Sequence, residues 1–152
     1  MISGRDLSPS EYNSNRDGVP YITGASNFSI GNVEIVRWTP VPQVITKYGD
    51  LLFTCKGTIG EMAMNSFGTA HIARQVMAIR NTYSFNMKYL QLCLNYYIDS
   101  IRASAKGLIP GISREDILNL IIPFPPLAEQ QDIVNITTSV YSILIEIEKS
   151  LS

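Results

Sequence analysis

The C-terminal part of this chain, residues 123–152, constrains the fold most strongly. Residues 123–126 include three prolines, which fix their own φ and disfavour helix in the residues before them, so this segment should be an extended link. Pro126 also suits the first position of a helix. Apolar residues then recur at spacings of three and four, at Ile133, Ile136, Val140, Ile143 and Ile147. This pattern, called the apolar seam below, predicts a helix over residues 127–150 that meets a second helix, with packing against its own domain as the alternative.

Residues 1–122 show a different pattern, in which short β-favouring runs are separated by turn residues. The continuous apolar run Asp50–Cys55 is typical of a buried strand. Lys56–Gly60 follows it with two glycines that allow a tight turn, and Glu61–Met64 should form the returning strand. Similar runs predict strands at 21–23, 33–37 and 75–80.

Helical spacing appears in residues 86–105, where Ser84 or Asn86 would cap the start and Gly107 would mark the end. Ser113–Asp116 resembles a capping box and predicts a short helix through Leu120. These patterns together predict an α+β fold. We expect residues 1–122 to form one domain, with a curled, mostly antiparallel sheet and packed helices. Residues 123–152 should form the proline link and a long coiled-coil-type helix that acts as a spacer or dimerisation element.

The charge distribution suggests that these two parts have different partners. The whole chain has a net charge of −1. Residues 1–114 contain eleven Lys and Arg against seven Asp and Glu, whereas residues 115–152 contain one against six. A mildly basic body is suited to bind a polyanion, whereas an acidic helix is suited to a different partner. The alternative is an acidic, solvent-facing helix on a domain without a special partner.

Little in the sequence favours catalysis. The only histidine, His71, has no nucleophile or base at a useful spacing. Cys55 and Cys93 lie far apart without the spacing of a zinc site, which is ordinary for a reduced, cytosolic protein. No apolar stretch matches a membrane span or a signal peptide. We therefore expect a cytoplasmic protein that is not an enzyme, holds no metal or cofactor and does not enter a membrane.

Four stretches, in order along the chain, resemble the specificity subunits of type I restriction–modification systems. Gly18–Ser26 is similar to an early G-I-P-Y-I segment, and Gly49–Gly60 is similar to a hairpin that ends in R/K-G-T-I-G. Gly111–Ser113 with the following Ile-Leu-Asn-Leu resembles the segment before the tail. Pro123–Gln131 is close to the P-x-P-P-L-x-E-Q start of the family's long helix.

This resemblance implies a division of labour. The globular body would read double-stranded DNA, and the helix would act as spacer and docking surface for a methyltransferase (modification) subunit. A restriction subunit would join through the complex. S-adenosylmethionine would bind only to the methyltransferase subunit. The competing hypothesis is a protein-interaction or scaffold module with no DNA role.

The chain has one recognition module and one helix, whereas a typical family member has two of each. It could be a half-length subunit that pairs with itself, a fragment or an inactive remnant. A homodimer through the apolar seam would restore two modules and would read a symmetric, bipartite site.

DNA affinity needs cations near phosphates, and specificity needs side chains that reach base edges. Lys56 is the first candidate, because it lies at a turn beside Gly57, where the backbone can approach a phosphate. The alternative is a plain glycine turn with a solvated lysine. Arg102 and Lys106 lie near a helix end, where cations also stabilise the dipole. The full set of DNA-binding candidates is Lys56, Gly57, Thr58, Arg102, Lys106, Arg74, Gln75, Arg37 and Asn27.

Overall fold

The computed structural model describes residues 1–29, 31–105, 108 and 110–151. Its strands are β1 Ile2–Ser3, β2 Val19–Ile22, β3 Phe28–Ser29, β4 Asn32–Val33, β5 Trp38–Thr39, β6 Ile45–Thr46, β7 Leu51–Thr54, β8 Met62–Met64, β9 Ala70–Ile72 and β10 Val76–Ile79. Its helices are η1 Pro9–Glu11 and η2 Ala25–Asn27, both 3-10, and α1 Met87–Tyr96, α2 Ile98–Ala103, α3 Arg114–Leu118 and α4 Leu127–Leu151.

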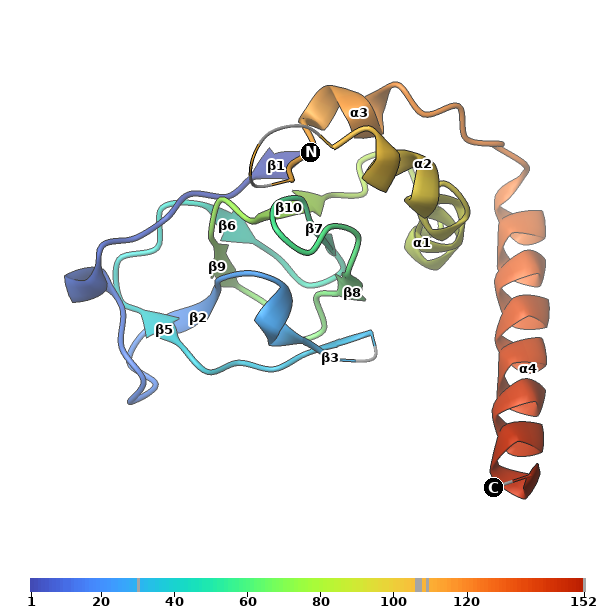
Figure 1. Ribbon diagram of the computed structural model, residues 1–152, viewed down its shortest axis with the longest axis horizontal. Coiled ribbons are helices and arrows are strands. Elements are labelled where there is room, and N and C mark those ends of the chain that lie inside the picture. The colour runs from blue at the N-terminus through green and yellow to red at the C-terminus, as the bar shows by residue number, and fades with distance from the viewer. Residues whose placement is uncertain (30, 106–107, 109, 152) are drawn as a thin grey trace.

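The strands form two four-stranded sheets and one hairpin rather than a single curled sheet. The first sheet has the order β1-β10-β7-β8 and is antiparallel throughout. The second has the order β5-β2-β9-β6, and its central pair β2–β9 is parallel. β3 and β4 form the hairpin. The predicted α+β fold with a mostly antiparallel sheet is therefore confirmed (Figure 1).

The first sheet is the middle layer of the body. Along β7, Leu51 and Phe53 pack in one core cluster with Leu94 of α1, whereas Leu52 packs in another with Ile72 of β9. Because successive side chains on a strand point to opposite faces, helices cover one face of this sheet and the second sheet covers the other. This double burial explains why the sequence of β7 is continuously apolar.

The predicted helix over residues 86–105 is broken into α1 and α2 at Tyr97, whose φ and ψ are −88° and 1°. Contacts on both sides of the break account for it. The Tyr97 hydroxyl donates to the carbonyl of Ile121 (2.8 Å), and Ile98 packs against Gly60, where an added Cβ would lie 2.1 Å from Ile98 Cδ1. Asn86 caps α1 as expected, because its side chain accepts from two backbone amides of the first turn.

The capping box at Ser113 is also confirmed. Its hydroxyl accepts from the amide of Asp116 (3.3 Å), and its own amide donates to the Asp116 carboxylate (2.7 Å). The helix that it opens, α3, ends at Leu118 rather than Leu120. Of the strands that the sequence predicted, 33–37 was too long, because only Asn32–Val33 pairs with β3.

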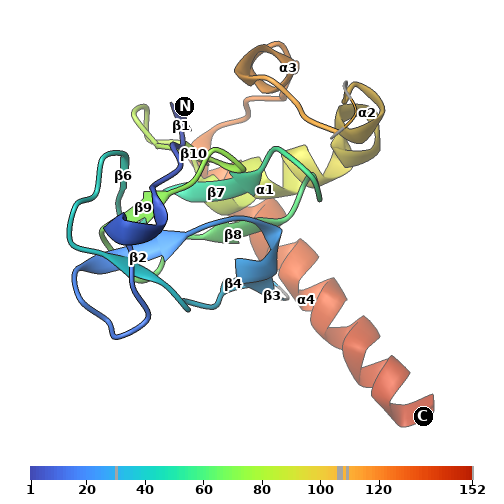
Figure 2. The ribbon, with the colours of Figure 1, turned by 60° about the vertical axis from the view of Figure 1, so that its left-hand side comes forward.

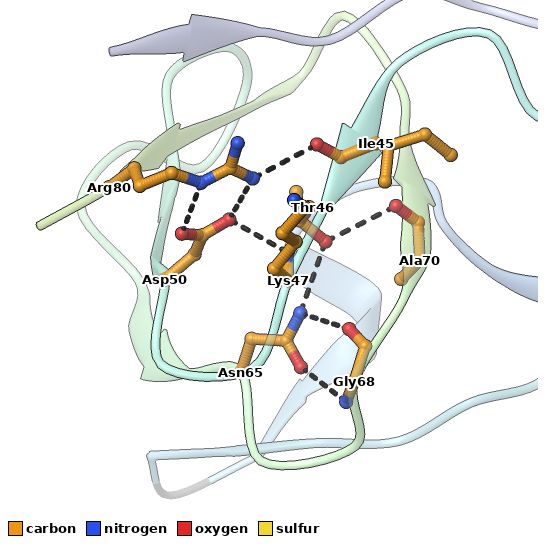
Figure 3. A network of polar contacts seen from close by, with 8 residues as sticks. All are labelled: Ile45, Thr46, Lys47, Asp50, Asn65, Gly68, Ala70 and Arg80. Atoms are coloured by element: carbon orange, nitrogen blue, oxygen red, sulfur yellow. Dashed lines mark hydrogen bonds and ion pairs between the residues drawn. The ribbon is translucent and has the colours of Figure 1, made fainter.

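An ion pair between buried Asp50 and half-buried Arg80 closes one end of the β7–β10 pair (Figure 3). The buried carboxylate of Asp50 accepts from Arg80 Nε (2.9 Å), Arg80 Nη2 (2.8 Å) and the amide of Lys47 (2.8 Å). Arg80 also donates to the carbonyl of Ile45 (3.2 Å). The hydrogen bonds that Arg80 donates to Asp50 raise the pKa of Arg80, so the guanidinium stays charged.

The side chain of Asn65 holds the turn between β8 and β9 beside this ion pair (Figure 3). Its amide nitrogen donates to Gly68 O (2.7 Å) and to Thr46 Oγ1 (3.1 Å), and its oxygen accepts from the amide of Gly68 (3.0 Å). Thr46 in turn donates to the carbonyl of Ala70 (3.2 Å). These buried contacts join β6 to β9 through side chains as well as through the strand pairing.

His71, which the sequence offered only as an unsupported catalytic residue, is a buried structural residue of the second sheet. It is fully buried on β9, and its Nδ1 accepts from the amides of Gln43 (3.2 Å) and Val44 (3.1 Å). Its Nε2 then donates to the carbonyl of Arg5 (2.8 Å), since Nδ1 has no proton. Burial lowers the pKa of His71, so the ring joins three segments as a neutral group.

Helix α4 packs on the body only at its start. It begins at Leu127, as predicted, and the carbonyl of Pro126 accepts from the amide of Gln130 (3.0 Å). The side chain of Gln130 is buried, accepts from the amide of Asn86 (2.9 Å) and donates to the carbonyl of Pro125 (2.8 Å). Val134 is buried one turn later, whereas every side chain from 138 to 151 is exposed. Figures 1 and 2 show the helix extending away from the sheets.

No helix in the described part of the chain has the length and apolar character needed to cross a membrane.

Candidate nucleic-acid interface

Four of the residues predicted to bind DNA lie together around one open hollow on the body. The hollow has a volume of about 430 Å³ and is lined by Lys56, Gly57, Arg74 and Gln75. These residues come from two turns that are far apart in the sequence, the one after β7 and the one before β10. The turns meet because β7 and β10 are antiparallel neighbours, with Thr54 opposite Val76. We call this the basic hollow.

The turn after β7 is fixed by its glycines and by a neighbouring segment. Gly57 and Gly60 have φ of +73° and +95°, a conformation that L side chains rarely adopt. The amide of Gly57 donates to the carbonyl of Pro110 (3.0 Å), and Lys56 forms a β-bridge with Gly111. The tip of the turn is therefore held from outside, and the exposed side chain of Lys56 stands on a fixed backbone.

The turn before β10 is held by Asp6 of the N-terminal segment. The Asp6 carboxylate forms an ion pair with Arg74 Nε (2.8 Å) and accepts from the Arg74 amide (3.1 Å). Both groups around the side-chain amide of Gln75 are acceptors, so we assign its nitrogen to that side, where it donates to Asp6 Oδ1 (3.2 Å) and to the carbonyl of Thr23 (3.1 Å). The Arg74 side chain nonetheless remains 65% exposed.

Cys55 joins the two turns beneath the hollow. Its amide donates to the carbonyl of Gln75 (2.8 Å), and its own carbonyl accepts from the amide of Ile112 (3.0 Å). The thiol donates to the carbonyl of Arg74 (3.5 Å). Burial raises the pKa of Cys55, so the thiol stays protonated and serves as packing rather than as a nucleophile.

The remaining candidates near this turn differ in what holds them. Thr58 is exposed at the tip. Arg102 Nε donates to the carbonyl of Ile59 (3.0 Å), so this side chain braces the turn from α2 and does not line the hollow. Lys106 lies outside the described residues.

Arg37 belongs to a second group of cations and aromatic rings on the β5–β2 side of the body. Its guanidinium lies 5.0 Å from the ring centre of Tyr12, and that of Arg16 lies 5.7 Å from the ring of Trp38. Arg16 has a positive φ of 66°. Tyr12 also packs against the buried cluster of Leu7, Tyr21 and Ala73, and Ala73 precedes Arg74. Arg37 was predicted from the sequence, whereas the aromatic rings beside these two arginines were not.

Asn27 is a correction. Its side chain is only 1% exposed and is occupied within its own loop. The oxygen accepts from the amide of Thr23 (2.9 Å) and from its hydroxyl (3.0 Å), and the nitrogen donates to the carbonyl of Glu34 (2.9 Å). Asn commonly stabilises loops through such local hydrogen bonds. Here these bonds occupy the side chain of Asn27, so it has no group left to contact DNA.

Asp6 was not predicted as part of this site. An acidic residue is a poor candidate for a DNA interface when considered alone, and its partner Arg74 is 68 residues away. No spacing rule connects the two positions. In the described part of the chain, no three His, Cys, Asp or Glu side chains gather in a way that would hold a metal ion.

The apolar seam of α4 is divided by the fold. Ile133, with Tyr89, Tyr96 and Pro123, lines an apolar hollow of about 330 Å³ between α1 and α4. The rest of the seam is exposed, from Ile136 at 65% to Ile147 at 49%. The alternative of packing against the chain's own body therefore holds for the first two turns only. The other large exposed apolar residues of the helix are Leu127, Tyr141, Leu144, Ile145 and Leu151.

The chain belongs to the family of type I restriction modification DNA specificity domains, whose model matches residues 2–152.

Its relatives agree with this family. The chain is 27% identical over 156 residues to the putative type I restriction enzyme MjaX specificity subunit of Methanocaldococcus jannaschii. The match covers 98% of this chain but 35% of the relative, so the chain spans about a third of that protein's length.

Solved structures show the same fold. A chain from a study of complex assembly and conformational transition of the type I R-M system superposes with a TM-score of 0.89 at 25% identity, covering 98% of this chain and 37% of that one. The HsdS subunit from Thermoanaerobacter tengcongensis gives 0.87 at 24%, covering 99% and 37%. The S subunit from M. genitalium gives 0.67 at 21%, covering 98% and 38%.

Proposed function

We propose that this chain recognises DNA sequence as a domain of a type I restriction–modification specificity subunit. The observation that carries the proposal is the family match over residues 2–152. Within that family, the basic hollow supplies a location for the interaction. The alternative of an interaction module without a DNA role leaves unexplained why two separate turns bring Lys56, Arg74 and Gln75 to one open surface.

The basic hollow suits the two tasks of a DNA-reading surface. Lys56 is an exposed cation beside a glycine with no Cβ to obstruct a phosphate, and it supplies sequence-independent affinity. Arg74 and Gln75 carry the donors and acceptors that base edges require. The rings under Arg16 and Arg37 would extend the cationic surface, since each guanidinium is held over an aromatic face.

The test is the salt dependence of duplex-DNA affinity for the whole chain. Each phosphate that a cation neutralises contributes about −0.9 to the slope of log K against log salt. Lys56→Ala should therefore weaken binding and reduce the magnitude of the slope by about one. Lys88→Ala removes another exposed lysine, from the first turn of α1, and is the matched control, which should change neither quantity. A wild-type chain that binds no duplex at low salt would contradict the proposal.

The chain itself is proposed to catalyse nothing. Methylation and cleavage would be carried out by a methyltransferase subunit and a restriction subunit, and S-adenosylmethionine would bind to the methyltransferase subunit. Work on genomic DNA would place the complex in the cytoplasm. The basic hollow has no arrangement of nucleophile and base among the described residues, since the Cys55 thiol is protonated and His71 is buried on another strand.

We further propose that α4 is a helix-pairing surface. Every side chain from 138 to 151 is exposed, so this part of the apolar seam has no contact with the body that buries it. A helix of 25 residues is about 37 Å long, and most of that length is available to a partner helix. A second copy of this chain would complete the seam, restore two recognition modules and give a two-fold protein that reads a symmetric bipartite site. A helix of the methyltransferase subunit is the other partner that would fit.

A further inference from the structure

We infer that Arg74, Gln75 and Asp6 form a reader of one G·C base pair, in which Asp6 positions the other two residues. The inference rests on the proposed DNA recognition and adds which base pair is read at this point of the basic hollow. It follows from which hydrogen-bonding groups of Arg74 and Gln75 are already engaged within the fold and which remain available to DNA.

Arg74 keeps one edge of its guanidinium free. A guanidinium has five N–H donors, of which Nε carries one and the two Nη atoms carry four. Asp6 Oδ2 occupies Nε at 2.8 Å, and within the described residues no hydrogen bond engages Nη1 or Nη2. The ion pair therefore fixes the direction of the side chain and leaves two parallel donors at its exposed end.

Gln75 presents a hydrogen-bond acceptor beside the two free donors of Arg74. Both hydrogens of its amide nitrogen are used, one toward Asp6 Oδ1 and one toward the carbonyl of Thr23. What remains is Oε1, which can only accept. Both side chains line the same hollow although they are consecutive in the chain, because they occupy the turn between β9 and β10.

Two donors next to one acceptor match one base pair in the major groove. A G·C pair presents two acceptors on guanine, N7 and O6, followed by one donor on cytosine, N4. On adenine the atom beside N7 is a donor, which would meet the Arg74 fork donor to donor. Thymine offers a single acceptor, O4, so it cannot engage both Nη atoms.

Asp6 is a positioning residue in this arrangement. It contacts both readers, so loss of its carboxylate would free Arg74 to adopt other rotamers and Gln75 to rotate its amide. It would also remove a negative charge from the DNA-facing surface. Asp6→Ala should therefore lower discrimination at one base pair while affinity for unrelated duplexes stays constant or rises. A simple loss of folding would lower both.

The experiment is selection from a pool of random-sequence duplexes by the full chain, followed by sequencing and by measured affinities for single-position variants of the selected site. We expect one G·C position whose replacement by A·T costs the wild type about 5- to 150-fold in affinity, the range of a bidentate contact. Arg74→Ala and Asp6→Ala should each reduce this preference at the same position and leave the preferences at other positions unchanged. Lys88→Ala should leave every position unchanged. Thermal unfolding of each variant checks that the fold is retained.

The outcomes separate this inference from the proposed function. A selected site in which Arg74→Ala alters no position, or alters one that is not G·C, would overturn the inference and leave DNA recognition standing. Failure of the wild type to enrich any duplex would count against DNA recognition itself. If Arg74→Ala removes the G·C preference and Asp6→Ala does not, the positioning role of Asp6 is wrong.

Discussion

The body and helix α4 use the same kinds of residue in opposite ways. In the body, apolar side chains on β7 are buried on both faces of the middle sheet. In α4, apolar side chains of equal size remain exposed along most of the helix. The charges differ as well, since residues 1–114 are net positive and residues 115–152 net negative. The difference supports the proposal that the body faces a polyanion and that α4 is completed by a protein partner.

Matched leucine deletions should show this contrast most strongly. Leu52 is fully buried, and Leu52→Ala should lower the free energy of unfolding by about 2–5 kcal/mol, because it removes apolar contacts and leaves a cavity. Leu144 is 48% exposed, and Leu144→Ala should cost less than about 0.5 kcal/mol in a monomeric chain. Chemical denaturation at low protein concentration measures both. Equal losses would mean that α4 packs on the body after all.

Charges in the apolar seam should abolish self-association without harming the body. Ile136→Glu with Val140→Glu places two carboxylates in a surface that would be buried between helices, where unpaired charge is costly. The molar mass in solution should fall from dimer to monomer, and denaturation of the body should be unaffected. Glu148→Gln, outside the seam on the same helix, is the control. A wild-type chain that is monomeric at every concentration would assign the seam to another subunit.

Removal of the guanidinium of Arg80 should weaken one end of the β7–β10 pair. Asp50 is buried and loses two of its hydrogen bonds in Arg80→Ala, which should cost about 3 kcal/mol because a buried carboxylate remains without its partner. Arg114→Ala removes an exposed arginine on α3 and should cost little. Stability of the body should fall, while self-association through α4 is retained by the folded fraction. An unchanged midpoint would show that water solvates Asp50 fully.

Acid should destabilise the body through His71, whereas α4 contains no histidine. Burial lowers the pKa of His71 below its ordinary value of 6.5, so the unfolded chain binds a proton at a higher pH than the folded chain does. The stabilising contribution of the neutral ring is therefore complete above pH 6.5 and is lost as the pH falls below it. The midpoint of denaturation, measured between pH 8 and pH 5 for the wild type and His71→Gln, should fall more steeply with acid in the wild type. Parallel profiles would contradict the buried, neutral state.

The sequence predicted those elements that depend on interactions between residues close together in the chain. The seam of α4, the Asn86 cap, the Ser113 capping box and the buried strand β7 all follow from spacing or from short-range hydrogen bonds. The break at Tyr97 did not, because it depends on Gly60 and Ile121, which are distant in the sequence. The two-residue strands are likewise defined by their partners and have no periodicity of their own.

The candidate site shows the same division. The glycine turn identified Lys56 and Gly57, and base-reading chemistry identified Arg74 and Gln75, but only the pairing of β7 with β10 brings the two sets together. Asp6 reaches Arg74 across the fold and left no local signal. Asn27 was misassigned because its residue type serves a loop and a base edge equally well.

Amide hydrogen exchange of the chain with and without a selected DNA duplex tests the central claim most directly, namely that DNA engages the body at the basic hollow and leaves α4 for protein partners. Exchange reports opening and covering segment by segment. We predict slower exchange on DNA binding in the turns around Lys56 and around Arg74 and Gln75, with no change from 138 to 151. Protection confined to α4, with both turns unchanged, would contradict the account.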